Sequence, residues 1–144
     1  MTQRKKVLFL CTGNSCRSQM AEGLLRHLAG DRFQVFSAGT HPTRIHPMTI
    51  RIMKEWGIDV SNHTANHVDE YLDHDIDIVI TVCDNAEEIC PVFPGAVKRI
   101  HWGIPDPFSG WSEDDRFMER YRTTRNLIRE RIEEFLTQNR VTYP

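Results

Sequence analysis

Apolar and polar positions along the chain form two kinds of pattern, one typical of buried strands and one typical of amphipathic helices. Residues 76–82 are a nearly continuous apolar run, which favours a central parallel strand buried on both faces. Shorter runs predict three further strands, at residues 6–11, 33–37 and 97–102. Because helical patterns separate these runs, the sequence predicts an α/β fold built on a parallel sheet.

Apolar residues at helical spacing predict the helices between the strands. The first helix is expected over residues 18–29, and the second begins at Pro47, whose missing N–H costs nothing in a first turn. A polar stretch then leads into a short helix near residues 69–72. The last helix carries the longest apolar stripe, and Ser112 with Asp115 three residues later resembles a capping box at its start.

Length and charge narrow the class of protein. The 144 residues and ordinary composition predict one domain over residues 1–144, and nothing in them demands more than a monomer. The formal net charge of −2 argues against a nucleic-acid partner. No apolar run approaches the roughly 20 residues of a membrane-spanning helix, and the first run is too short for a signal peptide. We therefore expect no membrane association and a cytoplasmic location, where the four cysteines are reduced at rest.

The loop over residues 11–18 carries the clearest chemical signal. It follows the first strand, precedes the first helix and contains Cys11-x5-Arg17-Ser18. A loop between a strand and a helix N-terminus directs backbone N–H groups and the positive end of the helix dipole at one point, which favours an anion. With a cysteine and an arginine added, the loop is a candidate nucleophilic centre for a tetrahedral oxyanion.

Each residue type in this loop has a chemical task. A free thiol with a pKa near ~8.5 supplies little thiolate at neutral pH, so the N–H groups, the helix N-terminus and Arg17 are expected to lower the pKa of Cys11. Arg17 can hold two oxygens with its planar fork, and Ser18 can donate its hydroxyl to the thiolate. Gly13 is expected to take a positive φ. Asn14 is expected to tolerate a left-handed conformation and to tie the loop together.

This loop resembles that of the low-molecular-weight protein tyrosine phosphatase superfamily, which follows C-x-G-N-x-C-R-S near the N-terminus. The resemblance runs nearly the whole chain and includes the Ser-Ala-Gly-Thr of residues 37–40. It implies a three-layer α/β sandwich with a four-stranded parallel sheet flanked by helices. It also implies Cys11 as nucleophile, Arg17 as oxyanion clamp and Asp106, before Pro107, as general acid, a role that a carboxyl group in a loop over the site can perform. The oxyanion-binding loop is completed by Thr12, Gly13, Asn14, Ser15, Cys16 and Ser18.

Two further cysteines, Cys83 and Cys90, allow three interpretations. Because Cys83 ends the apolar strand, it should lie at the same sheet edge as Cys11. Zinc binding by all four cysteines would need the Cys83-x6-Cys90 spacing, which is wider than in structural zinc sites, and would consume the nucleophile. Inert core thiols are the second interpretation, which suits Cys83 better than Cys90 in its polar segment. The third is a redox relay by successive thiol–disulfide exchange.

The same region closely resembles thioredoxin-coupled arsenate reductases. The matching segments are residues 58–64, Val82-Cys83, Cys90-Pro91, residues 97–98 and residues 101–103. The resemblance implies that Cys11 attacks arsenate, that a Cys11–Cys83 disulfide releases arsenite, and that Cys90 exchanges in to give Cys83–Cys90. Thioredoxin, or alternatively glutaredoxin, would then supply electrons, with no tightly bound cofactor. Residues 84–89, a possible short helix, would have to loosen to expose the final disulfide.

Two alternative functions stay open. A low-molecular-weight phosphatase that hydrolyses phosphate monoesters through a Cys11 phosphoenzyme needs only Cys11, Arg17, Ser18 and Asp106. The aromatic Phe108 is more like the phosphatases and indicates possible side activity on aryl phosphates. A redox or arsenic sensor using the second cysteine pair is disfavoured, because a sensor needs no general acid.

The role of two further features is undecided by sequence. Cys16 can form a protective disulfide with Cys11 or simply fill the loop. Some reductases of this family hold a potassium ion near the loop, and an amide here replaces one carboxylate of that set. The residues matching the ion's ligands are Asn14, Glu22, Ser37, Thr64 and Asn66.

Overall fold

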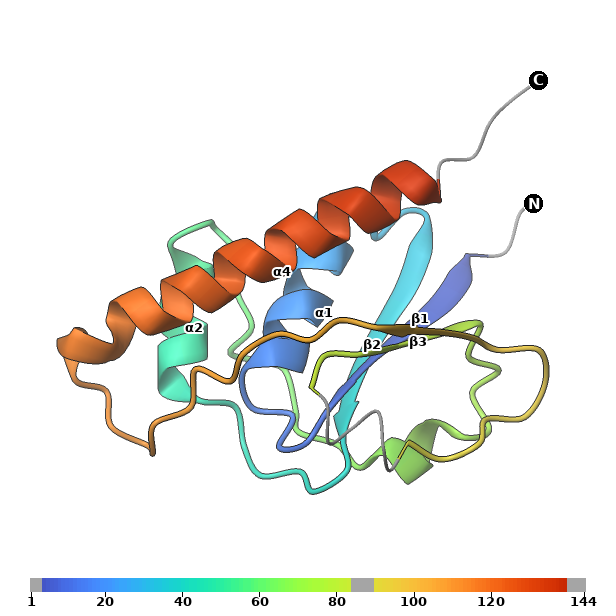
Figure 1. Ribbon diagram of the computed structural model, residues 1–144, viewed down its shortest axis with the longest axis horizontal. Coiled ribbons are helices and arrows are strands. Elements are labelled where there is room, and N and C mark those ends of the chain that lie inside the picture. The colour runs from blue at the N-terminus through green and yellow to red at the C-terminus, as the bar shows by residue number, and fades with distance from the viewer. Residues whose placement is uncertain (1–3, 84–89, 140–144) are drawn as a thin grey trace.

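Four parallel strands form the sheet of the computed structural model, which describes residues 4–83 and 90–139 (Figure 1). The strands are β1 (Lys5–Cys11), β2 (Phe33–Gly39), β3 (Ile78–Thr81) and β4 (Lys98–His101). Their order across the sheet is β2-β1-β3-β4, and each neighbouring pair is parallel. The prediction of an α/β fold on a parallel sheet is therefore confirmed.

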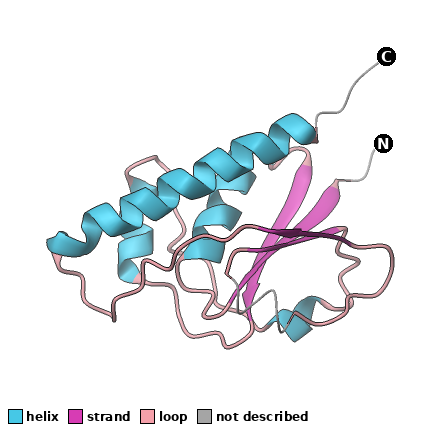
Figure 2. Cartoon of the chain, in the orientation of Figure 1, coloured by secondary structure: helices cyan, strands magenta, loops and turns pink. Residues whose placement is uncertain are grey.

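Helices cover one face of this sheet and a shorter segment covers the other (Figure 2). The helices α1 (Arg17–Ala29), α2 (Pro47–Lys54) and α4 (Met118–Gln138) pack against one another. Phe33 of β2 meets Phe135 of α4 with ring centroids 5.4 Å apart. Phe36, which points to the opposite face, meets Tyr71 of the 3₁₀ helix η1 (Val68–Tyr71) at the same separation. The sheet is thus enclosed on both sides, as the expected three-layer arrangement requires.

Burial of the central strands follows from their apolar sequences. Residues 7–10 of β1 are fully buried, and all four residues of β3 are buried, which confirms the prediction of a strand buried on both faces. On the helical side, Ile128 and Ile132 of α4 are fully buried. Each such aliphatic side chain contributes roughly 1.5–3 kcal/mol relative to exposure, so this packing anchors the strand that precedes the cysteine loop.

The start of the last helix differs from the prediction. Ser112 does not cap it: the Ser112 hydroxyl accepts the backbone N–H of Asp114. Asp114 instead caps the 3₁₀ turn η2 (Asp115–Phe117) by accepting the N–H of Arg116, and α4 begins only at Met118. Aspartate is a preferred N-cap residue, and the prediction from sequence named Ser112 rather than Asp114 for this role.

The carboxyl ends of β1, β2 and β3 lie at one edge of the sheet, where parallel strands of this fold class gather their functional loops. The loop after β1, the end of β2 and Cys83 after β3 meet there. Residues 84–89, including the predicted short helix, lie outside the described residues. In the part of the chain that the structure describes, no helix is both long and apolar enough to cross a membrane.

Candidate active site

The loop after β1 wraps its backbone and side chains around the sulfur of Cys11. The Ser18 hydroxyl lies 2.8 Å from Cys11 Sγ, and the backbone N–H of Asn14 donates to the same sulfur at 3.1 Å. Ser18 Oγ also accepts from Asn14 Nδ2 at 2.8 Å, which leaves its own proton available for a bond to the sulfur. Both predicted partners of the nucleophile are therefore in place.

Asn14 holds the loop together, as predicted, through a left-handed backbone and three side-chain hydrogen bonds. Its φ is 50°, and beyond Ser18 its amide donates to Ser37 Oγ at 3.0 Å and accepts the N–H of Asn66 at 2.9 Å. The prediction for Gly13 was wrong: the positive φ in this loop belongs to Asn14, and Gly13 takes none. Asparagine is the non-glycine residue that tolerates this conformation best, and here its side chain is fixed by partners on both sides.

Gly39 is a functional position that the loop motif alone did not identify. A Cβ built at Gly39 would stand 2.5 Å from the carbonyl oxygen of Thr12 and 3.0 Å from the nitrogen of Asn14. The loop therefore passes directly over the end of β2, and only glycine leaves room for it. Gly39 does belong to the Ser-Ala-Gly-Thr segment that resembles the phosphatase superfamily, but the sequence alone gives no steric reason for a glycine there.

Burial dominates the electrostatics of the nucleophile. The pKa of the Cys11 thiol is raised above its ordinary value by desolvation, although the Ser18 hydroxyl, the Ser18 N–H and the Arg17 charge all act to lower it. The predicted groups thus act in the predicted direction, but the net shift is upward, because the strand end that positions Cys11 also removes it from water. The groups of the loop therefore offset part of the cost of ionising a buried sulfur.

Arg17 and Asp106 lie together, although 89 residues separate them in sequence. The Arg17 Nη1 donates to the carbonyl oxygen of Ile104 at 2.9 Å, and its Nη2 lies 3.4 Å from Asp106 Oδ2. The other carboxylate oxygen of Asp106 accepts the N–H of Phe108 at 3.0 Å. With 52% of its side chain exposed, Asp106 stands at the mouth of the loop, where a carboxyl group can reach a leaving oxygen.

Cys83 lies at the same edge as the nucleophile. It is buried, its sulfur is 3.3 Å from Thr12 Oγ1, and its charge acts to raise the pKa of Cys11. The structure therefore brings Cys83 next to the residue that follows Cys11, as its position at a strand end predicted. None of the four cysteines, all of which lie in the described residues, forms a disulfide.

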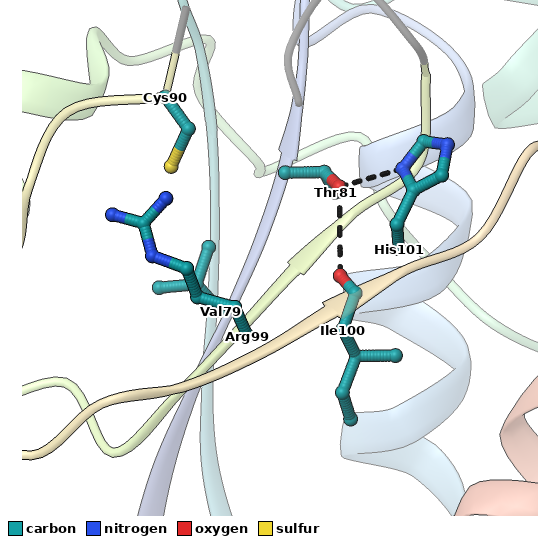
Figure 3. A pocket seen from close by; sticks show the side chains of 6 residues that line it. All are labelled: Val79, Thr81, Cys90, Arg99, Ile100 and His101. Carbon is teal, nitrogen blue, oxygen red and sulfur yellow. Dashed lines mark hydrogen bonds between the residues drawn. The ribbon is translucent and has the colours of Figure 1, made fainter. Parts of the chain in front are cut away.

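Cys90 lies on the sheet face opposite the helices, against β3 and β4 (Figure 3). Its sulfur points toward the Arg99 guanidinium and lies 3.5 Å from the Pro91 carbonyl oxygen, which Arg99 Nη2 also binds at 2.7 Å. Burial raises the pKa of the Cys90 thiol, and Arg99 acts to lower it. Together they border a cavity of about 190 Å³, completed by Val79, Thr81, Ile100 and His101.

Cys16 is a buried residue of the oxyanion loop. Its thiol donates to Ser15 Oγ at 3.7 Å, and burial raises its pKa to about 11. A thiol with this pKa is a weak nucleophile, so filling the loop is the role that this environment supports. Among the residues that the structure describes, which include all four cysteines, no group of three His, Cys, Asp or Glu side chains is arranged to hold a metal, so the zinc interpretation is not supported.

The five residues that matched a potassium site are near one another but bind each other. Ser37 Oγ donates to Glu22 at 2.5 Å, Thr64 Oγ1 donates to Asn66 Oδ1 at 2.6 Å, and the Asn14 amide oxygen accepts a backbone N–H. The free carboxylate oxygen of Glu22 pairs with Arg26 at 2.6 Å. These oxygens already have partners within the protein, so a potassium ion would bind only by breaking these pairs, including that of Glu22 with Arg26.

We accordingly expect no response to potassium. Replacing potassium chloride by sodium chloride at equal ionic strength should leave the Tm within roughly 1 °C, whereas saturation of a specific site at 100 times its Kd would add about 2.7 kcal/mol of stability. Thermal unfolding at several potassium concentrations measures this directly. A Tm that climbs with potassium but not with sodium would contradict this expectation.

The chain as a whole is similar to known proteins of one family. A family described as low molecular weight phosphotyrosine protein phosphatase matches residues 6–142. Arsenate reductase 2 of Staphylococcus epidermidis is 44% identical over 136 residues, which are 94% of this chain and 98% of that protein. A solved arsenate reductase in the oxidized state is 34% identical, with a TM-score of 0.79 over 93% of this chain and 98% of its own. The thioredoxin-dependent arsenate reductase of Corynebacterium glutamicum is 29% identical, with a TM-score of 0.70 over 96% of this chain and 65% of its own.

Proposed function

The chain belongs to the low molecular weight phosphotyrosine protein phosphatase family, and within that family we propose that it reduces arsenate to arsenite through a relay of three thiols. Its similarity to arsenate reductases over nearly its whole length supports the reaction. The observation that carries the relay is the position of Cys83, whose sulfur lies 3.3 Å from the hydroxyl of the residue that follows Cys11. A phosphatase has no use for a second thiol there.

Binding uses the loop and Arg17. Arsenate is a tetrahedral oxyanion, so the inward N–H groups at the start of α1 and the guanidinium can hold its oxygens. Arg17 must exchange its bond to Asp106 for one to the substrate, which leaves Asp106 free to act on the leaving oxygen. The Ile104 carbonyl keeps the guanidinium at the loop during this exchange.

In the first chemical step, Cys11 sulfur forms a bond to arsenic(V) and one oxygen leaves as water. The water forms from a hydroxyl group of the bound arsenate and the proton that Cys11 loses. Asp106 transfers this proton to the leaving oxygen. The Ser18 hydroxyl, aimed at the sulfur from 2.8 Å, stabilises the thiolate as it forms. Arsenic is still in the +5 state in this adduct.

Reduction takes place in the second step. Cys83 thiolate attacks Cys11 sulfur, the sulfur–arsenic bond breaks, and its electron pair stays on arsenic, which leaves as arsenite. The two thiols lose two electrons and become the Cys11–Cys83 disulfide. Cys90 then attacks Cys83, which frees Cys11 and forms Cys83–Cys90.

We propose thioredoxin as the reductant of the last disulfide, because 96% of this chain is covered by its similarity to a thioredoxin-dependent arsenate reductase. We propose that the protein works as a monomer in the cytoplasm, where such dithiol reductants are kept reduced. Residues 84–89, which would have to loosen for this step, lie outside the described residues.

A coupled assay tests the proposal. With thioredoxin, thioredoxin reductase and NADPH, we expect NADPH oxidation that requires arsenate and yields one arsenite for each NADPH. Substituting glutaredoxin and glutathione should give a clearly slower rate. NADPH oxidation that is absent, or that proceeds equally without arsenate, would contradict the reductase function.

The same protein preparation should also be assayed for hydrolysis of an aryl phosphate. Phe108 and Trp111 are exposed by 41% and 36% beside Asp106, and an aromatic wall of this kind suits an aryl substrate. We expect slow hydrolysis as a side activity. Efficient hydrolysis without arsenate reduction would favour the phosphatase function instead.

A further inference from the structure

His46 is a fully buried histidine that the mechanism above does not use. It is the N-cap of α2, where its Nδ1 accepts the backbone N–H of Met48 at 3.0 Å. Because Nδ1 is an acceptor, the ring's proton is on Nε2, which donates to the carbonyl oxygen of Gly110 at 2.8 Å. The imidazole thus joins the start of a helix to a loop 64 residues later in the sequence.

The same residue is also attached to the oxyanion loop. The backbone N–H of His46 donates to the carbonyl oxygen of Ser15 at 3.1 Å, and Thr49, one turn further along α2, donates its hydroxyl to that oxygen at 3.2 Å. The first turn of α2 therefore has a fixed position relative to the nucleophile. Any group that His46 holds is positioned relative to Cys11 as well.

Gly110 closes the loop that carries Asp106. Arg17 binds this loop at Ile104, and His46 binds it at Gly110, so both ends of the seven-residue segment 104–110 are attached by hydrogen bonds. Asp106 lies between these two attachments.

Ring packing reinforces the second attachment. The His46 ring stacks on Trp111 with centroids 5.1 Å apart and an interplanar angle of 12°, and Phe108 meets its edge at 5.8 Å. Phe108 is the residue whose N–H orients the carboxylate of Asp106. A displacement of the His46 ring would therefore reach Asp106 through one aromatic contact and one hydrogen bond.

We propose that His46 is a positioning residue for the general acid: its Nε2–H···O bond to Gly110 fixes the far end of residues 104–110 and so sets the position of Asp106 over Cys11. This inference rests on the proposed function in one respect, the role of Asp106 as proton donor. An error of about 1 Å in placing such a group is enough to slow the chemical step by roughly 100-fold. Without such a bond, a seven-residue surface loop held only by its two covalent ends could move by about 1 Å.

Two substitutions separate the two hydrogen bonds of the ring. In His46→Asn the side-chain oxygen can still cap α2, because asparagine is a preferred N-cap, but no atom reaches Gly110. In His46→Gln the longer amide can reach Gly110, but the cap is lost. We expect His46→Asn to lower kcat about 10-fold with little change in KM for arsenate, and His46→Gln to retain more of kcat than His46→Asn. Both variants lose the buried ring, so both should lower Tm by roughly 2–4 °C. His27→Asn, on the exposed side of α1, is the matched control and should change neither quantity.

A double-mutant cycle tests whether the effect passes through Asp106. Because Asp106→Asn removes the general acid, it should cost about 100-fold or more in kcat, and adding His46→Asn should then cost nothing further. A further 10-fold loss in the Asp106→Asn background would overturn the proposal, since His46 would then act on the fold or the oxyanion loop. An unchanged kcat in His46→Asn alone would overturn it as well.

Hydrogen–deuterium exchange supplies a readout that needs no turnover. The backbone amides of Asp106 and of residues 108–110 should exchange about 10-fold faster in His46→Asn, while those of residues 12–18 keep their wild-type rates. Unchanged exchange at these four amides would refute the proposal even if arsenate were not the substrate. If the wild-type protein hydrolyses aryl phosphate but does not reduce arsenate, the cycle is run on hydrolysis, so a failure of the proposed function and a failure of this inference give different results.

Discussion

Replacing Cys90 with serine should leave a protein that reduces one arsenate and then stops. Cys11 and Cys83 are at one sheet edge and can complete the chemistry on arsenic by themselves, so a single equivalent of arsenite is expected in the first turnover. The Cys11–Cys83 disulfide then remains in a buried position, where a protein reductant has poor access. We expect the thioredoxin-coupled steady-state rate to fall about 100-fold or more.

Rapid quenching followed by arsenite quantification measures the burst, and peptide mapping identifies the disulfide. The trapped species should be Cys11–Cys83, whereas Cys83→Ser should release no arsenite at all. Hydrolysis of an aryl phosphate by Cys90→Ser serves as the control, since hydrolysis requires no second or third thiol. Sustained turnover of arsenate by this variant at the wild-type rate would refute the relay.

The surroundings of Cys90 favour the thiol–disulfide exchange that the Cys90→Ser variant cannot perform. Its thiol lies over the face of β3 and β4 that carries Val79 and Thr81, held next to Arg99 (Figure 3). Burial disfavours its thiolate and the Arg99 charge favours it, so the neighbouring guanidinium offsets part of the cost of ionising this cysteine. Serine at this position keeps the hydrogen-bonding capacity but cannot exchange with a disulfide.

Sequence predicted the parts of the structure that depend on local pattern. The strand that ends at Cys11, the amphipathic helix after it and Pro47 at the first position of α2 all follow from apolar spacing and from residue-specific backbone limits. The convergence of Cys11 and Cys83 also followed, because parallel strands place their carboxyl ends at one edge. These inferences use rules that hold within a single element or between neighbouring strands.

What sequence did not predict depends on contacts between distant segments. Desolvation of Cys11 is set by everything packed around β1, so the direction of its pKa could not be read from the groups inside the loop. The pairing of Glu22 with Arg26 removes the charge that a potassium site would need, although the five matching residues are all present. The double attachment of His46 involves a carbonyl oxygen 64 residues away, for which no local pattern exists.

Gly39→Ala should damage both the fold and the site, for a purely steric reason. The new methyl group would stand 2.5 Å from the carbonyl oxygen of Thr12 and 3.1 Å from Cβ of Asn14. The first is a backbone atom and cannot rotate away, so the loop over residues 12–14 must shift. We expect a loss of about 1–3 kcal/mol in the free energy of unfolding, a Tm lower by roughly 3–10 °C, and kcat/KM lower by about 100-fold.

Gly13→Ala is the matched control for this experiment, because it adds the same methyl group to the same loop. Its Cβ would meet Thr43 Oγ1 at 3.4 Å, an ordinary contact, and Gly13 has no positive φ to be strained. Its Tm should therefore stay close to that of the wild type while the Tm of Gly39→Ala falls. Equal Tm values for the two variants would mean that the loop does not press on β2. The N–H of Asn14, 3.1 Å from Cys11 Sγ, would then owe its position to the side-chain bonds of Asn14 alone.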